Sequence, residues 1–368
     1  MVISVYDRTM ILQGDIDKYT TLMWYRRYWQ CGEFKLLVPF TRRHAILLQK
    51  GNIIMKRSGN EAGVIRYFYI RKNTQGKTVI EVQGKFLPRW IGKRVVLNQI
   101  ITTAAPPVIM RRIVTENVTS PANVNRRINN ILIGGITGIS RPAIEYQSEE
   151  YQNALIALET AAKAASLGFA VYTDARALNH TFQIYDGLNL TDGNGVYPPC
   201  IFSQRFDNIL EQDYLNSVEN LRTTAYVGGE IRENVPRQIV EVNPQPSGLD
   251  RDEIWVSAQD IKQTYRENQQ EITIPLAQYL NMLRQRGAEE LENYTEVLGF
   301  TSKVNTNSKL VYKKDYNLGD RVTCVNKDWG VKINVRITEI AEIYQRNAKA
   351  EIEITFGESL PALFDVIK

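Results

Sequence analysis

Histidine and cysteine are scarce in this chain. Its 368 residues include two histidines, His44 and His180, and three cysteines, Cys31, Cys200 and Cys324, which lie far apart. This scarcity excludes most histidine-containing catalytic triads, histidine-rich metal sites and zinc-knuckle spacings, and also a disulfide framework. We interpret the cysteines as buried, reduced thiols of a protein made in a cytoplasm.

Long apolar runs and a strong excess of one charge are also missing. No run approaches the roughly 20 apolar residues of a membrane-spanning helix. The first residues lack the basic and apolar regions of a secretory signal. The net charge is +5, from 45 Lys and Arg against 40 Asp and Glu, which is too mild for a dedicated nucleic-acid-binding protein.

Motifs that carry common chemistry are absent as well. The sequence has neither a phosphate-binding G-x-x-x-x-G-K-[ST] loop nor an H-E-x-x-H helix. Asp186 and Asp192 lie near a turn rich in Gly and Asn, but the ligand spacing and closing glutamate of a calcium loop are missing. Adjacent glutamates at 149–150 and 289–290 point in different directions on a helix, unlike a glycosidase pair. We therefore expect no catalytic, cofactor-binding or metal-binding site.

Short segments of alternating polar and apolar residues dominate both ends of the chain. Near the start they cover residues 33–39, 64–70 and 77–82, and near the end residues 331–339 and 350–356. Period-two alternation over several short strands predicts antiparallel sheets or barrels.

The middle of the chain predicts helices. Residues 148–168 begin with Ser148 and two glutamates, continue with an apolar stripe and end at a glycine. Strands at 169–173 and 180–185 should complete a small α/β unit. Residues 252–300 also predict helix, and 249–299 hold ten acidic and five basic residues, so this region is acidic while the remainder is basic.

The two β-rich ends share a spacing of glycines. They are Gly51, Gly63 and Gly84 near the start and Gly319, Gly330 and Gly357 near the end. The first separations are 12 and 11 residues, and the second are 21 and 27. Chance similarity and a true duplication both fit this pattern. A duplication would place residues 63–70 and 330–337 at equivalent positions in two copies of one β-module.

A family resemblance rests on residues from both ends. They are Trp24, Arg26, Arg27, Tyr28, Gly32, Phe34, Pro39 and Gly51 near the start, and Gly319, Asp320 and Gly357 near the end. Together with the order of the predicted elements, they resemble the hub proteins of the baseplate or tail tip of long-tailed bacteriophages.

The resemblance implies an α+β fold that is mostly β. Two similar antiparallel β-barrel-like tube domains would flank an inserted α/β domain, and a helical insertion would interrupt the second. On this sequence the expected boundaries are 1–102 for the first tube domain and 103–215 for the α/β domain. The second tube domain would comprise 216–248 and 301–368, around a helical insertion at 249–300.

The resemblance also implies a structural, non-enzymatic role. Three copies would form a pseudo-six-fold ring that adapts a six-fold tail tube to a three-fold tip and leaves a channel for DNA without sequence-specific binding. The expected partners are further copies of the chain, a tail tube or distal tail protein, a tip spike or fibre protein and the tape measure protein. We expect no cofactor and no membrane span, and a place in the virion tail after assembly in the host bacterial cytoplasm.

Three cations on polar strand faces, Arg66, Lys332 and Arg336, are candidates for an interface or for the lumen of such a ring. Two other functions remain open from the sequence. One is a carbohydrate- or receptor-binding tail protein, in which aromatic residues such as Trp24 would line a sugar groove. The other is a tail-associated peptidoglycan hydrolase.

Overall fold

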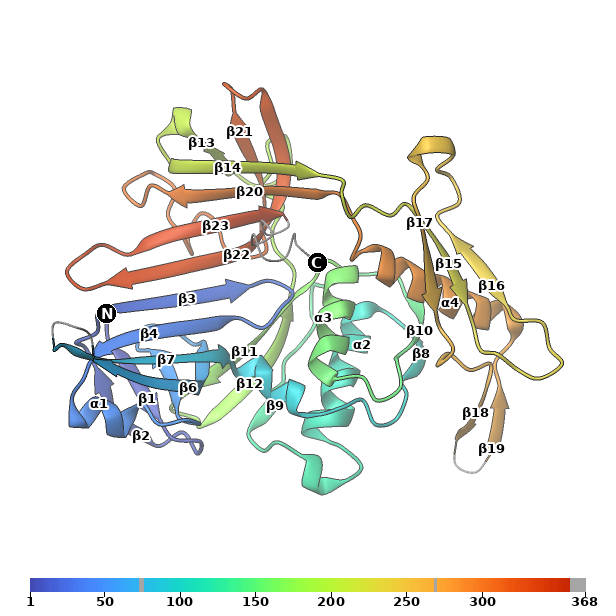
Figure 1. Ribbon diagram of the computed structural model, residues 1–368, viewed down its shortest axis with the longest axis horizontal. Coiled ribbons are helices and arrows are strands. Elements are labelled where there is room, and N and C mark those ends of the chain that lie inside the picture. Colours follow the sequence, from blue (N-terminus) through green and yellow to red (C-terminus); the bar gives the residue numbers. More distant parts are fainter. Residues whose placement is uncertain (73–75, 268–269, 358–368) are drawn as a thin grey trace.

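A large sheet runs through the computed structural model, which describes residues 1–72, 76–267 and 270–357 (Figure 1). Within these residues thirteen strands belong to it, and their pairing is almost entirely antiparallel. They are β1 (Ile3–Tyr6), β2 (Leu12–Ile16), β3 (Thr21–Arg27), β4 (Glu33–Pro39), β5 (Ile53–Lys56), β6 (Ala62–Lys72), β7 (Thr78–Phe86), β13 (Ile201–Ser203), β14 (Ile209–Ser217), β20 (Val297–Val304), β21 (Arg321–Asn326), β22 (Val331–Gln345) and β23 (Glu351–Gly357). The expected mostly β, α+β fold is confirmed.

The strands alternate as their sequences predict. In β4 the buried side chains are Phe34, Leu36 and Val38, and the strand ends at a proline. In β23 the apolar side chains Ile354 and Phe356 are buried in the same alternating way. Because one face of each strand is apolar, the sheet buries two adjacent hydrophobic cores, one in each half of the chain.

Two halves of the sheet repeat one strand order. The first module is β3-β4-β7-β6-β5, and the second is β14-β20-β23-β22-β21. The connections between the strands match as well. Along the chain the first module runs β3, β4, β5, β6, β7, and the second runs β14, β20, β21, β22, β23. Strand β22 pairs with β3, so the two modules join edge to edge and the sheet within the described residues stays open instead of closing into two barrels.

The same hydrogen bonds occur at the same place in each module. The Gly51 N–H donates to the Ile65 carbonyl (2.8 Å), and the Ile65 N–H donates to the carbonyl of the residue after Gly51 (2.9 Å). Gly319 and Ile337 make the matching pair of bonds (2.9 and 2.8 Å). Both glycines have a φ of 94°, a left-handed conformation that favours glycine. A β-bulge follows Ile65 and Ile337 alike.

This shared pattern corrects the register that the glycine spacing predicts. Gly63 lies within β6, two residues before Ile65, whereas Gly330 lies in the turn before β22. Matching Ile65 with Ile337 makes residues 63–70 equivalent to 335–342, five residues from the predicted 330–337. The prediction fails because glycines occupy different places in the two meanders, and only Gly51 and Gly319 correspond.

The segment between the modules forms a smaller α/β unit beside the large sheet (Figure 1). Its elements are η1 (Leu87–Lys93), β8 (Ile101–Ala104), α2 (Pro106–Val114), the π-helical turn η2 (Thr115–Thr119), η3 (Val124–Arg126), β9 (Ile131–Ile133), β10 (Ile144–Gln147), α3 (Ala154–Ala164), β11 (Gly168–Asp174) and β12 (Asn179–Tyr185). Outside this unit, the short helix α1 (Arg42–Leu47) belongs to the first module, and the turn η4 (Gln204–Phe206) connects β13 and β14 of the large sheet. Strands β11 and β12 lie where the sequence predicts them. Helix α3 lies within the predicted segment 148–168 but begins only at Ala154, because Asn153 and not Ser148 is its N-cap.

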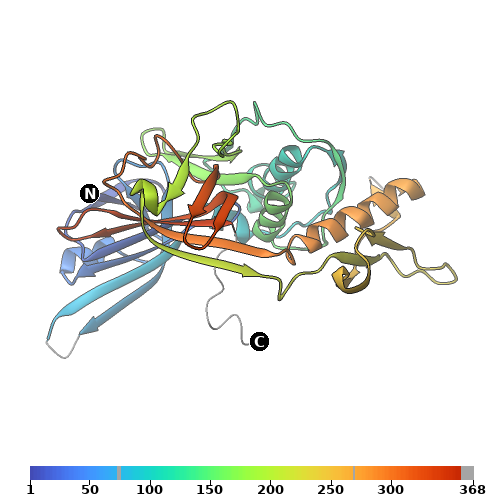
Figure 2. The same cartoon turned by 90° about the horizontal axis from the view of Figure 1, so that it is seen from above.

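An insertion separates β14 from β20 and extends away from the large sheet (Figure 2). It contains β15 (Thr224–Gly228), β16 (Ile239–Val242), η5 (Gly248–Asp250), β17 (Glu253–Ser257), β18 (Thr264–Glu267), β19 (Gln270–Thr273) and α4 (Leu276–Leu291). The prediction of helix throughout 252–300 is therefore wrong. The segment 253–257 alternates and pairs with β15, helix begins only after Pro275, and Phe300 belongs to strand β20.

None of the helices in the described part of the chain is both long enough and apolar enough to cross a membrane.

Candidate functional site: the module junction

The junction of the two modules brings together residues that the sequence singled out. Strands β3 and β22 pair antiparallel, from Arg27 opposite Glu339 to Thr21 opposite Gln345. Four predicted family residues, Trp24, Arg26, Arg27 and Tyr28, lie on β3 or directly after it. Their contacts reach the first module, the second module and the α/β unit.

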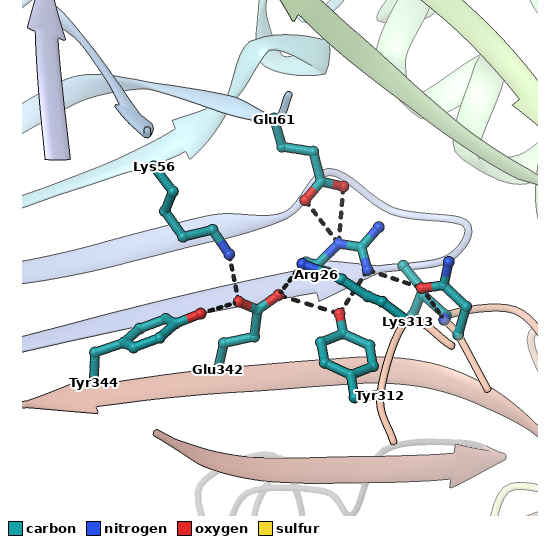
Figure 3. A network of polar contacts seen from close by, with 9 residues as sticks. Arg26, Lys56, Glu61, Tyr312, Lys313, Glu342 and Tyr344 are labelled. Carbon is teal, nitrogen blue, oxygen red and sulfur yellow. Dashed lines mark hydrogen bonds and ion pairs between the residues drawn. The ribbon is translucent and has the colours of Figure 1, made fainter. Parts of the chain in front are cut away.

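Glu342 on β22 is the centre of a buried polar network (Figure 3). Its carboxylate forms an ion pair with Lys56 of β5 and another with Lys313 (3.1 Å). The hydroxyls of Tyr344 and Tyr312 donate to the same carboxylate at 2.5 and 3.1 Å. Because only 1% of the Glu342 side chain is exposed, these four donors replace water as its partners.

Arg26 continues this network on the other side of Tyr312 (Figure 3). Its Nε donates to both carboxylate oxygens of Glu61 (2.9 and 2.7 Å). Its Nη1 donates to the Tyr312 hydroxyl (2.6 Å) and to Asn317 Oδ1 (3.1 Å). Lys56 and Glu61 come from the first module, while Tyr312, Asn317 and Glu342 come from the second, so the network links the two.

The electrostatics of the network favour the charged form of Glu342. Burial alone would raise the pKa of this carboxyl, but the ammonium groups of Lys56 and Lys313 outweigh burial and lower the pKa to about 2. Removing one partner of such a buried pair leaves the other charge without compensation. The junction therefore depends on all members of the network being present.

Trp24 is part of the core of the first module. Its indole is fully buried, stacks on Phe34 (ring centroids 5.9 Å apart) and contacts Phe86 (4.5 Å). The Lys56 ammonium lies 5.1 Å from the centre of the Trp24 ring. A ring enclosed in this way does not present a face to a sugar.

Tyr28 connects the junction to the α/β unit. The side chain is fully buried, and its hydroxyl lies 3.2 Å from the Ser166 carbonyl and 3.3 Å from Asp186 Oδ1. The Arg336 guanidinium lies 4.9 Å from the ring centre. Burial raises the pKa of Tyr28 to about 12, so the hydroxyl keeps its proton. On the exposed side, Arg27 pairs with Glu339 (2.6 Å) and Glu33 (2.8 Å).

The remaining family residues hold turns and close contacts. The Asp320 carboxylate accepts from the N–H groups of Leu188 (2.8 Å) and Asn317 (2.7 Å). Gly319 packs against the Tyr28 ring, where a side chain would collide. The others are placed as follows: Gly32 and Gly84 lie where a side chain would collide with neighbouring backbone, Pro39 ends β4, Gly330 precedes β22 and Gly357 ends β23.

The three candidate lumen or interface cations have different surroundings. Arg66 is exposed and lines a cavity of about 590 Å³ together with other cations. Lys332 pairs with Asp192 (2.6 Å). Arg336 is mostly buried, against Tyr28 and Asp186.

The two carboxylates weighed as calcium ligands lie in ion pairs. Asp186 pairs with Arg141 (2.6 Å) and Asp192 with Lys332. Within residues 1–72, 76–267 and 270–357, no three His, Cys, Asp or Glu side chains gather as a metal ion would require.

Sequence reasoning missed Lys56, Glu61, Tyr312 and Glu342. One signal for Glu342 is present in the sequence, because this acid stands on the apolar face of an alternating strand, between Ile340 and Tyr344. A charge at such a position usually has a buried partner. The identity of the partner is not visible, since Lys56 lies 286 positions away along the chain.

Comparisons with known proteins agree with this architecture. The model of the siphovirus ReqiPepy6 Gp37-like protein family matches residues 2–358. No curated protein matches the chain.

Solved structures of three tail proteins have a similar fold. A tail protein from Neisseria meningitidis MC58 is 12% identical, with a TM-score of 0.57 over 97% of this chain and 96% of that one. The prophage tail protein gp18 from Listeria monocytogenes EGD-e is 14% identical, with a TM-score of 0.56 over 100% and 97%. The 43 kDa tail protein of prophage MuSo2 from Shewanella oneidensis is 13% identical, with a TM-score of 0.56 over 97% and 98%. At these identities the likeness is one of fold.

Proposed function

Because the chain belongs to the siphovirus ReqiPepy6 Gp37-like protein family and has the fold of phage tail proteins, we propose that it is the structural hub of a tail tip or baseplate. The resemblance to tail proteins of long-tailed phages is confirmed. In the proposed hub, three copies form a ring with pseudo-six-fold symmetry around a channel for DNA, and the ring adapts a six-fold tube to a three-fold tip.

The observation that carries this proposal is the repeated module. Each chain contributes two modules with the same strand order and the same hydrogen bonds at Gly51 and Gly319. The modules are already joined edge to edge through β22 and β3. Three such chains supply six similar modules, which is the number that a six-fold neighbour requires.

The proposed partners follow from this position in a tail. They are two further copies of the chain, a tail tube or distal tail protein on the six-fold side, a tip spike or fibre protein on the three-fold side, and the tape measure protein with DNA in the channel. The signature residues from Trp24 to Tyr28, with Glu342 and Arg336, are proposed to hold the two modules in the orientation that the ring needs. The hub would have no catalytic role and would be a component of the virion tail, assembled in the cytoplasm of the host.

The mass of the assembled protein in solution tests the proposal. We expect particles of three times the 42.2 kDa chain mass, formed by the chain alone or with the tube protein, and six-fold features in electron-microscopic averages of them. Particles of two or four chains, or averages without a ring, would contradict the hub. Release of soluble fragments from peptidoglycan by the purified chain would contradict the purely structural role.

A further inference from the structure

We infer that neighbouring copies join by pairing β6 of one copy with β14 of the next, in the antiparallel way that β22 pairs with β3 inside the chain. This inference rests on the proposed ring and names the surface that closes it. The occupant of each surface is a second copy of this chain.

In the second module, one edge of the long strand β22 pairs with two different strands. Residues 331–336 of β22 pair with β21, and residues 339–345 pair with β3. In the first module, β5 pairs with residues 62–64 of the equivalent strand β6. Residues 67–72 of β6 have no strand partner on that side within the described part of the chain. The β6–β7 hairpin extends outward from the sheet, as Figure 2 shows.

The open stretch of β6 carries apolar surface that water faces in a single copy. Tyr67, Tyr69 and Ile70 are 45, 46 and 42% exposed. An exposed, apolar strand edge is a template for pairing with another strand. In the second module, β3 covers the equivalent edge of β22. Within the described residues, no strand takes that place beside β6.

Strand β14 supplies the complementary edge. It takes the place of β3 in the second module: β3 pairs with β4, and β14 pairs with the equivalent β20. The outer side of β3 is covered by β22, but the outer side of β14 has no partner within the described residues. Each copy thus has one free edge of each kind, and contacts between unlike edges repeat around a ring.

The internal junction also gives the register. The bulges match Ile65 with Ile337, which makes Ile70 equivalent to Glu342. In the first module Trp24 lies opposite Phe34, and in the second module Tyr214 lies opposite Phe300, the equivalent of Phe34. Tyr214 is therefore the equivalent of Trp24. Since Glu342 pairs with Trp24, Ile70 of one copy should pair with Tyr214 of the next.

The side chains that this register brings together are complementary. Tyr69 comes opposite Leu215 on one face, and Ile70 comes opposite Tyr214 on the other. One position further, Arg71 comes opposite Asp213. Apolar residues therefore meet apolar residues, and a cation meets an anion, as in stable cross-strand pairs. A shift by one residue would place Asp213 opposite Ile70 and exchange the faces of every pair.

A basic cavity lies beside the same edge. The cavity of about 590 Å³ that contains Arg66 is lined by five cations and, among the described residues, by no Asp or Glu. These cations are Arg8, Lys50, Arg66, Lys93 and Arg94. Burial and the charges of Arg66 and Arg8 lower the pKa of Lys93, so the cavity favours an incoming anion.

The internal junction shows what should enter this cavity. Tyr28, directly after β3, covers Gly319, and Gly319 corresponds to Gly51. Gly51 lines the basic cavity. The residues that follow β14 in the same way are Val218 and Glu219, which are exposed in a single copy. Because Trp24 corresponds to Tyr214, Val218 of the next copy takes the place of Tyr28 over Gly51. We place Glu219, the next residue, at the mouth of the basic cavity.

Engineered cysteines test the register. Paired residues of antiparallel strands have Cα atoms about 4.5–5.5 Å apart, within the range of about 4.4–6.8 Å that a disulfide spans. The variant Tyr69→Cys/Leu215→Cys is oxidised mildly at a concentration where the wild-type chain is trimeric. We expect covalent dimers and trimers on a denaturing gel. The three natural cysteines are buried, so they should not contribute.

The matched control is Tyr69→Cys/Tyr214→Cys, in which the second cysteine lies one residue away and points to the other face. It should give little cross-linked product. Tyr214 packs against Phe300, so the control should lose some stability. Cooperative unfolding of both reduced variants, and their assembly into trimers, would exclude misfolding as a cause. If the wild type is trimeric and both variants cross-link equally or not at all, the inferred surface is wrong while the ring stands. If the wild type forms no trimer, alone or with the tube protein, the proposed ring fails and the inference fails with it.

Discussion

Glu342 is a buried acid held by groups that come from distant parts of the chain. Its ion pair with Lys56 is almost completely enclosed, with 1% and 5% of the two side chains exposed. The pair of Arg27 and Glu339, on the other face of the same strands, has side chains that are 24% and 23% exposed. The two ion pairs cross one junction, but the Glu342 pair is shielded from water and its acid also binds Lys313 and two tyrosine hydroxyls. Comparing them measures the contribution of this buried network.

Replacing Glu342 by Gln should weaken the fold strongly. The variant leaves the Lys56 ammonium buried without an opposite charge, and such a loss destabilises by about 3–5 kcal/mol. The control Glu339→Gln removes a partly exposed pair and should lose less than about 1 kcal/mol. Chemical denaturation gives both free energies of unfolding. Equal losses in the two variants would show that burial of the Glu342 pair has no special role.

Acid should weaken the junction through the same group. The pKa of Glu342 is lowered from 4.5 to about 2 in the folded chain. A lowered folded pKa stabilises the fold in full above the unfolded pKa, and this contribution is lost as the pH falls towards the folded value. The difference in unfolding free energy between the wild type and Glu342→Gln should therefore shrink between about pH 4.5 and about pH 2. A difference that stays constant over this range would contradict the assignment.

Strands that alternate are the elements that the sequence predicts well. In β4 and β23 the period-two pattern coincides with burial, because each strand has one apolar face. Helix α3 also follows its pattern. By contrast, β17 and β19 lie where helix is expected. Each has only four or five residues, and so short a pattern is outweighed by the helical segment that follows Pro275. Pairing of β3 with β22 is a contact between distant segments, for which local pattern carries no information.

The insertion between β14 and β20 should be replaceable. Ser217 and Val297, at its two ends, lie directly opposite each other in the sheet, so a two-residue Asn-Gly turn in place of residues 218–296 would join the strands as a hairpin. We expect cooperative unfolding, since the cores of both modules remain. Some stability should be lost, because the hydrogen bond from Arg286 to the Gln147 carbonyl disappears. Calorimetry measures the transition, and its disappearance would mean that the insertion completes the core.

In the proposed ring each chain is one third of the assembly, and its β22–β3 junction is the contact that the ring would repeat between copies. The β22–β3 junction fixes the angle between two modules, and the same angle repeated at β6 and β14 determines whether three copies close. The five cations beside β6 and the exposed acids Glu211 and Asp213 of β14 lie on the two surfaces that would meet. Complementary charge of this kind selects one order of copies, head to tail, over contacts between like surfaces.

A charge exchange tests that order. Arg71→Glu alone, or Asp213→Arg alone, places like charges opposite each other at every contact between copies. At about 1 kcal/mol for each contact, the concentration at which half of the chains are trimeric should rise by about tenfold. The double variant Arg71→Glu/Asp213→Arg restores opposite charges and should assemble nearly as the wild type does. Higher salt should reduce the defect of each single variant, since exposed charges are screened.

The control for this exchange pairs Arg71→Glu with Asp328→Arg, a reversal at an exposed acid in the turn before β22. It has the same net charge as the rescuing variant but creates no new pair with residue 71, so it should remain as defective as Arg71→Glu. Sedimentation of the variants over a range of concentrations measures their assembly. Restoration by Asp328→Arg as complete as by Asp213→Arg would mean that net charge alone governs association. In that case Arg71 and Asp213 would not face each other, and the ring would have to close through other strands.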